Sequence, residues 1–240
     1  MSYLIVGAST GLGRALAEEY AGAGFDLVLV SRDQRDVEPL AAHLRIRFGI
    51  VAIALAADLA RDDQYVVAVE DALAQVSPLR GLLLPIGASH LDDQIGLSDD
   101  LMMQIVYTNF LNPCRLLNLL LPRLRGGEVV GFGSVAGVRG RTRNAAYAAS
   151  KSALLTYFES LRHWAAAEGV AVRFYIPGYL DTNLAFSQNL PFRAADTRSL
   201  ARRVRADTGL TRTRYFPGYW RFIVSLLLLL PWSIYRRLRF

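Results

Sequence analysis

The sequence has almost no lysine and almost no cysteine. Lysine and arginine together number 27 in a chain of 240 residues, but Lys151 is the single lysine and the other 26 are arginine. Cys114 is the single cysteine, which excludes an intrachain disulfide and indicates a reducing compartment. The first residues form neither a basic segment nor a long apolar one, so we predict no secretory signal and expect a cytoplasmic protein.

Acidic residues are scarce at the C-terminal end of the chain. Residues 202–240 contain nine arginines and one acid, Asp207, a net charge of +8 against +6 for the whole chain. This leaves a net charge of −2 for residues 1–201. Because the basic character belongs to the tail, we expect no nucleic-acid-binding face on the main domain.

The sequence also lacks an apolar run that could span a bilayer, which takes about 20 residues. Residues 222–235 are fourteen mostly apolar residues, interrupted by Pro231 and flanked by arginines. Three interpretations of the segment 218–240 stay open: peripheral contact with an anionic membrane face such as the inner one, packing on its own domain or on a second subunit, and covering of an apolar substrate path. We also expect a homo-oligomer.

Short apolar runs alternate with helical stretches through most of the chain. The runs at residues 3–6, 25–30, 50–57, 79–84, 128–133 and 170–176 predict strands, and the stretches between them predict helices, among them 37–48, 62–76, 98–121 and 147–168. This alternation predicts a single α/β domain of the Rossmann type over residues 1–217, a doubly wound parallel sheet with helices on both faces. Residues 183–200 lack periodicity, and the basic apolar extension follows at 218–240.

A glycine-rich turn lies between the first predicted strand and the first helix. Its spacing, G-x-x-x-G-x-G, brings the backbone close to a ligand at a helix N-terminus, which favours a dinucleotide pyrophosphate. A flexible loop would not explain three glycines directly before a regular helix. The predicted cofactor contacts here are Gly7, Ser9, Thr10, Gly11, Leu12 and Gly13.

The ends of the second and third predicted strands indicate which dinucleotide binds. An acidic residue at the end of the second strand would favour NAD, but Ser31 and Arg32 stand there, and a guanidinium can bind a 2′-phosphate. We therefore favour NADP(H). Asp33 keeps NAD(H) open, unless it is a helix N-cap. Asp58 and Leu59 follow the third strand, where the acid either faces the adenine or caps a loop.

Three residues could together protonate a carbonyl oxygen. Tyr147 and Lys151 are four positions apart, so on a helix they share one face, and Ser134 follows a buried strand. A free phenol has a pKa of about 10, and a nearby ammonium lowers it. The alternative is that Tyr147 and Lys151 are ordinary helix residues. The only lysine of the chain stands at this spacing, where a titratable ammonium is not replaceable by a guanidinium, and this favours function.

Asn109 lies inside the predicted helix 98–121, shortly before Pro113. A proline has no N–H and leaves a carbonyl of the preceding turn without its partner. We predict a local kink here that could anchor a water molecule.

With these residues, the chain resembles the short-chain dehydrogenase/reductase family over roughly residues 3–185. The glycine turn matches the cofactor motif of that family, although Val6 replaces the usual threonine. Asn109, Ser134, Tyr147 and Lys151 match the catalytic tetrad in order and spacing. A further match, on the nicotinamide side of the cofactor, is formed by Pro177, Gly178 and Thr182.

The resemblance implies hydride transfer between NADP(H) and a ketone or alcohol, with no metal. Tyr147 would be the acid, Ser134 would orient the carbonyl, Lys151 would lower the tyrosine pKa and hold the nicotinamide ribose, and Asn109 would keep a relay water. Residues 183–205 would form a substrate lid. Two departures are the run Pro85-Ile-Gly87-Ala in place of Asn-Asn-Ala-Gly, with Gly87 still expected at the cofactor, and a C-terminal part unlike the forms that end in a short glycine-rich strand.

The substrate is less determined than the reaction. Arg139, Arg141 and Arg143 could bind an acidic group, or form a solvated basic loop. The tail and the run 133–141 resemble family members that reduce a keto-sugar on a polyprenyl phosphate, so we favour a bulky, lipid-linked or acidic small-molecule ketone. The alternatives are a non-catalytic cofactor-binding module and a membrane-surface interaction protein.

Overall fold

One parallel sheet of seven strands organises the part of the chain that the structure describes. The structure is a computed structural model, and it describes residues 1–60, 65–181 and 193–238. The strand order is β3-β2-β1-β4-β5-β6-β7, and every pairing is parallel. The strands are β1 (Ser2–Val6), β2 (Asp26–Ser31), β3 (Ala52–Ala56), β4 (Leu79–Leu84), β5 (Glu128–Phe132), β6 (Ala171–Pro177) and β7 (Arg212–Phe216).

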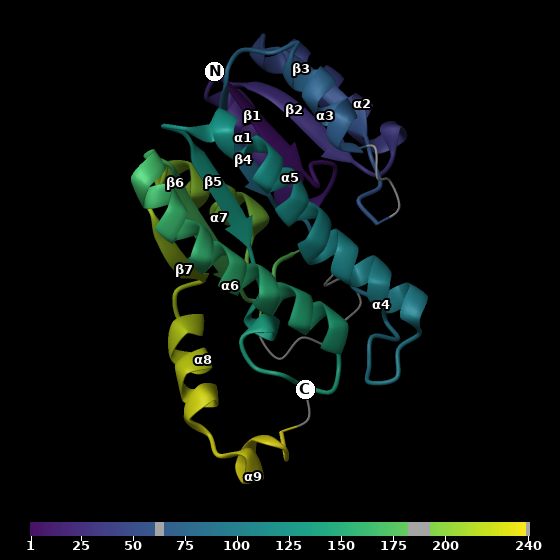
Figure 1. Ribbon diagram of the computed structural model, residues 1–240, viewed down its shortest axis with the longest axis vertical. Coiled ribbons are helices and arrows are strands. Elements are labelled where there is room, and N and C mark those ends of the chain that lie inside the picture. The colour runs from purple at the N-terminus through teal and green to yellow at the C-terminus, as the bar shows by residue number, and fades with distance from the viewer. Residues whose placement is uncertain (61–64, 182–192, 239–240) are drawn as a thin grey trace.

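Helices cover both faces of this sheet (Figure 1). The first core packs α3, α5 and α6 against one face, and the second packs α1, α2 and α7 against the other. The predicted doubly wound α/β fold is therefore confirmed. The helices are α1 (Gly11–Gly22), α2 (Gln34–Phe48), α3 (Tyr65–Leu73), α4 (Asp99–Val106), α5 (Asn112–Leu120), α6 (Ala145–Glu168), α7 (Thr197–Ala206), α8 (Trp220–Leu229) and α9 (Trp232–Tyr235).

The central strands read as continuous apolar runs because they are buried on both faces. All five residues of β1 and all five of β5 are buried. The turns that follow β1, β4, β5 and β6 meet at the carboxyl edge of the sheet. This edge is where open α/β sheets place their ligands.

Strand β7 and helix α7 differ from the sequence prediction. The sequence Arg-Thr-Arg-Tyr-Phe of β7 is half polar, yet it pairs with β6 as an edge strand, where one side stays open to solvent. Residues 197–206, expected within a substrate lid, form α7, whose Leu200, Ala201 and Val204 are buried against α1. The stretch 183–200, in which the sequence shows no periodicity, thus ends in the first turn of this helix, and the lid stays a prediction. Residues 182–192 lie outside the described residues.

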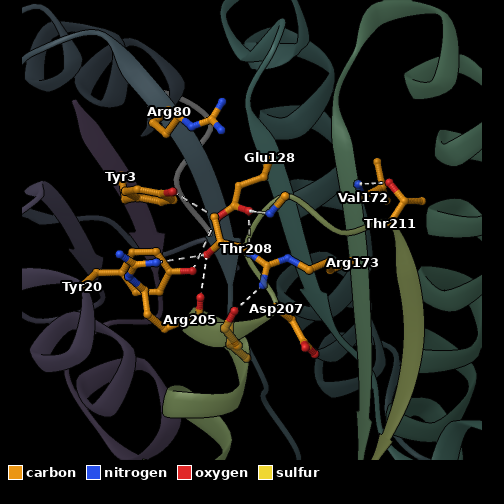
Figure 2. A network of polar contacts seen from close by, with 12 residues as sticks. Tyr3, Tyr20, Arg80, Glu128, Val172, Arg173, Arg205, Asp207, Thr208 and Thr211 are labelled. Carbon is orange, nitrogen blue, oxygen red and sulfur yellow. Dashed lines mark hydrogen bonds and ion pairs between the residues drawn. The ribbon is translucent and has the colours of Figure 1, made fainter. Parts of the chain in front are cut away.

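A buried ion pair joins β5 and β6 at the amino edge of the sheet (Figure 2). The Glu128 and Arg173 side chains are fully buried, and their charged atoms lie 2.6 Å apart. Tyr3 donates its hydroxyl to Glu128 Oε1 at 3.1 Å, and Gly209 donates its N–H to Glu128 Oε2 at 3.2 Å. Burial and the Glu128 charge raise the pKa of Tyr3 far above its usual value, so the phenol stays a donor. The network ties β1, β5, β6 and the turn after α7 together, away from the candidate site.

Candidate active site

The glycine turn forms a tight junction between β1 and α1. Gly7 has a φ of +91°, in the left-handed region, and donates its N–H to the Val30 carbonyl at 2.8 Å. A Cβ on Gly13 would lie 1.8 Å from the Gly7 carbonyl oxygen, so the first turn of α1 requires glycine to reach the strand end. The N-terminus of α1 thus opens directly at the carboxyl edge of the sheet. This arrangement fits a dinucleotide pyrophosphate, which binds helix N–H groups.

The end of β2 lies beside this turn and carries the predicted ribose contacts. Ser31 donates its hydroxyl to Ser9 Oγ at 2.7 Å, which joins two of the predicted contact residues. Asp33 is the N-cap of α2 and accepts from the Arg35 N–H at 2.8 Å. The hydrogen bonds and charge of Arg35 lower the pKa of Asp33 to about 2. Asp33 is thus a helix N-cap, one of the two alternatives that the sequence allowed. Arg32 is exposed, so its guanidinium can reach a phosphate.

Asp58 caps the loop that follows β3. Its carboxylate accepts from the Ala60 N–H at 3.0 Å, which is the loop-cap alternative. Leu59 is buried, and its carbonyl accepts from the side chain of Asn112. An adenine contact by this pair stays a prediction.

Lys151 is buried in α6 and reaches the ends of β4 and β5. Its side chain is about 3% exposed, and Nζ donates to the carbonyl oxygens of Ile86 at 2.5 Å and Phe132 at 3.1 Å. Nζ lies 5.9 Å from the centroid of the Tyr147 ring. Burial lowers the pKa of Lys151 to about 7. The lysine therefore titrates near neutral pH, beside the ring of the expected acid.

Tyr147 and Ser134 meet at the end of β5. Burial raises the pKa of the Tyr147 phenol, while a hydrogen bond with Ser134 and the charge of Arg141 oppose this rise. Ser134 Oγ also accepts from the Ala136 N–H at 3.1 Å. The expected lowering of the Tyr147 pKa by Lys151 stays a prediction.

Asn109 lies in a π-helical turn, Tyr107–Leu111, between α4 and α5. The expected kink is present, and the Asn109 carbonyl has no i+4 donor because Pro113 has no N–H. The buried side chain accepts from the Ala88 N–H at 2.7 Å and donates to the Ala88 carbonyl at 2.8 Å and to Ser150 Oγ at 3.1 Å. Asn109 thus ties the turn after β4 to α6.

The turn after β4, residues 85–88, contacts two of the expected catalytic residues through its backbone. Ile86 accepts from Lys151 and Ala88 pairs with Asn109, in each case through main-chain atoms, with Gly87 between them. Side-chain identity in this turn therefore matters little to these contacts.

Three comparisons place the chain among known proteins. The short chain dehydrogenase family model matches residues 2–190. The chain belongs to the short-chain dehydrogenase family. Among its relatives, the Bacillus subtilis protein "Uncharacterized oxidoreductase YmfI" is 30% identical over 187 residues, 75% of this chain and 75% of that protein. The Rattus norvegicus protein "Inactive hydroxysteroid dehydrogenase-like protein 1" is 24% identical over 233 residues, 93% of this chain and 70% of that protein.

Among solved structures, a short-chain dehydrogenase from Sphingobium yanoikuyae in complex with NADPH superposes with a TM-score of 0.81 at 25% identity. The match covers 99% of this chain and 96% of that one. Together, the family match and this structure confirm the predicted family and the enzyme class, a NAD(P)-dependent oxidoreductase.

In this short-chain dehydrogenase, the turn after β6 packs against helix α8. Pro177 ends β6, and Gly178 donates its N–H to the Phe216 carbonyl at 2.9 Å. A Cβ on Gly178 would lie 1.8 Å from Trp220 Nε1, so the indole of α8 packs directly on this glycine. Thr182, the third residue expected on the nicotinamide side, lies outside the described residues.

The three loop arginines do not act as one group. Arg139 donates to the carbonyl oxygens of Leu227 and Leu230, and its guanidinium lies 3.8 Å from the centroid of the Tyr235 ring. The Tyr235 hydroxyl in turn donates to the Gly140 carbonyl at 2.8 Å. Arg139 therefore fastens the tail, a contact that neither alternative from the sequence includes, and a role of the loop arginines at an acidic substrate stays a prediction.

Arg141 and Arg143 are placed differently from Arg139. Arg141 is half-buried beside Tyr147, and its Nε is buried without a hydrogen-bond partner among the described residues. Arg143 is exposed, and its backbone bridges to Gln94. Of the three, Arg141 is thus the one whose charge acts on Tyr147.

Asp93 contacts the start of α6, which its sequence context does not indicate. This residue is about 2% exposed and accepts from the N–H groups of Ala146 at 2.8 Å and Tyr147 at 2.9 Å. An aspartate in an irregular stretch, more than fifty residues before its partners, carries no local signal of this contact.

The described part of the chain contains no helix that is both long and apolar enough to cross a bilayer.

Proposed function

We propose that this protein is an NADPH-dependent ketone reductase, and an alcohol dehydrogenase in the reverse direction. The observation that carries the proposal is the meeting of Tyr147, Ser134 and Lys151 at the carboxyl edge of the sheet, next to the glycine turn. A bound nicotinamide supplies the hydride. The chain supplies the proton and the position of the carbonyl.

Tyr147 donates its proton to the carbonyl oxygen of the substrate. The phenol is protonated at neutral pH, as an acid in the reductive direction requires, but burial alone raises its pKa and makes it a weaker acid than a free phenol. Ser134 is hydrogen-bonded to the phenol and orients the carbonyl oxygen. Lys151 lowers the phenol pKa when charged, holds the nicotinamide ribose and, with a pKa of about 7, exchanges a proton with a water at the Asn109 carbonyl.

NADP(H) is the cofactor, held over the glycine turn with its 2′-phosphate at Arg32. Two observations support this choice. Arg32 is exposed, and the carboxylate of Asp33, which would bind the ribose hydroxyls of NAD, is already bound to Arg35. The NADPH in the Sphingobium relative agrees with it. Arg32→Glu should reverse the preference for NADPH over NADH, measured by fluorescence titration with each cofactor.

The substrate is a bulky ketone with an acidic or lipid-linked part. Arg141 is half-buried and its charge acts on Tyr147, which supports an acidic group near the reacting carbonyl. The resemblance to reductases of polyprenyl-phosphate keto-sugars remains the basis for a lipid carrier.

Stopped-flow oxidation of NADPH with ethyl benzoylformate and benzophenone tests the reaction. Wild type should reduce at least one of these ketones, and Tyr147→Phe should lose at least about 1,000-fold in the rate of hydride transfer, because the acid and its hydrogen bonds to the oxyanion are removed together. Equal rates in the two proteins would refute the mechanism. Tight NADPH binding without turnover of any ketone would instead favour the non-catalytic alternative.

We also propose that residues 218–240 contact an anionic membrane surface. Helix α8 projects from the sheet edge, and α9 lies at its far end (Figure 1). Phe222, Leu229 and Trp232 are 76%, 80% and 68% exposed, and the exposed arginines 221, 236 and 237 flank them. A cytoplasmic location stays a prediction.

Flotation with phosphatidylcholine vesicles, with and without phosphatidylglycerol, tests the membrane contact. Wild type should float with the anionic vesicles, and a Leu229→Glu/Trp232→Glu variant should not. Equal flotation of both proteins would contradict the proposal.

A homo-oligomer is proposed from the outer face of α6. A hollow of about 600 Å³ there is lined by small residues and by Phe110 and Tyr157, a shape that suits a second copy. Light scattering after gel filtration should give a multiple of 26.6 kDa.

A further inference from the structure

Helix α6 carries both Tyr147 and Lys151, and its own N-cap residue does not cap it. The first N–H groups of any helix lack partners within the helix. Asn144 stands at the N-cap position of α6, but its φ of 56° and ψ of 45° are left-handed, and its side chain makes no capping hydrogen bond. The first turn also has no acidic residue. The N–H groups of this turn therefore need an acceptor from elsewhere in the chain.

Asp93 supplies that acceptor with both of its carboxylate oxygens. Oδ1 accepts from the Ala146 N–H at 2.8 Å, and Oδ2 accepts from the Tyr147 N–H at 2.9 Å. The Asp93 carbonyl accepts from the Asn144 N–H at 2.7 Å. Asp93 thus accepts from three N–H groups at the helix start, and one of these groups belongs to Tyr147 itself.

Asp93 is buried, although apolar residues on both sides of it in the chain are exposed. Neighbouring Leu91 and Ile95 are 90% and 84% exposed, whereas Asp93 is about 2% exposed. A buried carboxylate is stable only with hydrogen bonds or charge to compensate it, and a helix N-terminus supplies both. The backbone bridge between Gln94 and Arg143 lies directly beside these bonds.

We infer that Asp93 is a positioning residue for catalysis, which sets the phenol of Tyr147 by holding the N–H groups of Ala146 and Tyr147. The inference rests on the proposed reductase function of the same site. Loss of the carboxylate shifts the first turn of α6, which carries the phenol. Lys151 lies one turn further along and keeps its own bonds to Ile86 and Phe132, so cofactor binding is affected less.

Asp93→Asn tests this inference, because the amide keeps the size of the side chain but has one acceptor where the carboxylate has two. The matched control is Asp92→Asn, since the Asp92 side chain is 79% exposed and pairs only weakly with His90 at 3.5 Å. Single-turnover oxidation of NADPH by the better of the two test ketones should slow about ten- to a hundredfold in Asp93→Asn, because a misplacement of about 1 Å can cost a hundredfold. The NADPH dissociation constant should change less than about threefold, and Asp92→Asn should match wild type.

An unchanged single-turnover rate in a folded Asp93→Asn protein would overturn the inference. So would equal losses in rate and NADPH affinity, which would show a merely structural role. On the Tyr147→Phe background, Asp93→Asn should add little further loss, because both changes act through one group. A full additional loss there would also overturn it. If Asp93→Asn does not fold, Asp93→Glu takes its place: it keeps both oxygens but is one methylene longer, so it should displace the first turn of α6 and slow the single-turnover rate, with the NADPH dissociation constant again within about threefold of wild type.

Hydrogen exchange separates this inference from the reductase proposal. The amides of Ala146 and Tyr147 should exchange faster in Asp93→Asn than in wild type or Asp92→Asn, whether or not any ketone is reduced. Unchanged exchange would refute the role of Asp93, and absent turnover with faster exchange would instead refute the reductase proposal.

Discussion

Replacement of Lys151 by methionine should remove a pH dependence from the stability of this protein. Burial lowers the pKa of Lys151 from 10.5 to about 7 in the folded chain. Between these values the unfolded chain binds the proton and the folded chain does not, so the free energy of unfolding of wild type rises as pH rises through this window. Below pH 7 both states are protonated, and the cost of burying the ammonium is present in full.

The two pKa values set the size of the effect. Each pKa unit corresponds to about 1.4 kcal/mol, so the full cost of the buried ammonium is about 5 kcal/mol. Wild type should carry nearly all of this cost at pH 6, about 3 kcal/mol at pH 8 and about 1 kcal/mol at pH 10. Methionine has no charge, but it leaves the Ile86 and Phe132 carbonyls without their donor, a loss that does not depend on pH.

Urea unfolding of wild type and Lys151→Met at pH 6, 8 and 10 measures the effect. The difference in unfolding free energy, variant minus wild type, should fall by about 4 kcal/mol from pH 6 to pH 10. Other titrating groups cancel in this difference. A difference that stays constant within about 1 kcal/mol would show that the lysine is not desolvated. It would then be no proton donor near neutral pH either.

Three further changes probe the fold around the site. Arg173→Met should lower the free energy of unfolding by about 3–5 kcal/mol, because it leaves Glu128 buried without its ion-pair partner. Adding Glu128→Gln to this variant should restore most of the lost stability. A loss below about 1 kcal/mol in urea unfolding of Arg173→Met would contradict the prediction. Gly178→Ala should cost about 1–3 kcal/mol and change the tryptophan fluorescence, because the new Cβ would meet the indole of Trp220, and an unchanged emission spectrum would argue against that contact. Arg139→Gln should speed limited proteolysis of the C-terminal helices, because its bonds to their carbonyls are lost, and an unchanged cleavage rate would refute the fastening role.

The sequence was sufficient where the pattern is local. Central strands buried on both faces give continuous apolar runs, and β1 and β5 were found within one residue of their ends. Tyr147 and Lys151 lie on one helix at a fixed spacing, so their shared face followed from helix geometry. The glycine turn was equally local, because a close approach of helix and strand leaves no room for a Cβ.

The sequence does not predict contacts between residues that are distant in the chain, nor elements that combine buried apolar residues with exposed polar ones. The contacts of Asp93 and Arg139 join side chains to main-chain atoms more than fifty residues away, and main-chain partners leave no trace in residue types. Strand β7 gives no apolar run, because an edge strand keeps polar residues on its open side. Helix α7 gives only a weak apolar pattern, because arginines surround its buried Leu200 and Val204.

The main-chain contacts also explain why the unusual turn after β4 is compatible with the positions of Asn109 and Lys151. Lys151 and Asn109 bind carbonyl and N–H groups of Ile86 and Ala88, and every residue type at these two positions offers the same carbonyl. These contacts require only that the backbone of residues 85–88 stay in place. Two residues outside the turn are therefore expected to tolerate little substitution. A Cβ on Gly7 would lie 3.3 Å from the Pro85 carbonyl oxygen, and Asn109 is hydrogen-bonded to Ala88. Substitution of Ile86 by another apolar residue should then leave hydride transfer nearly unchanged, whereas Asn109→Leu should slow it although it does not touch the substrate.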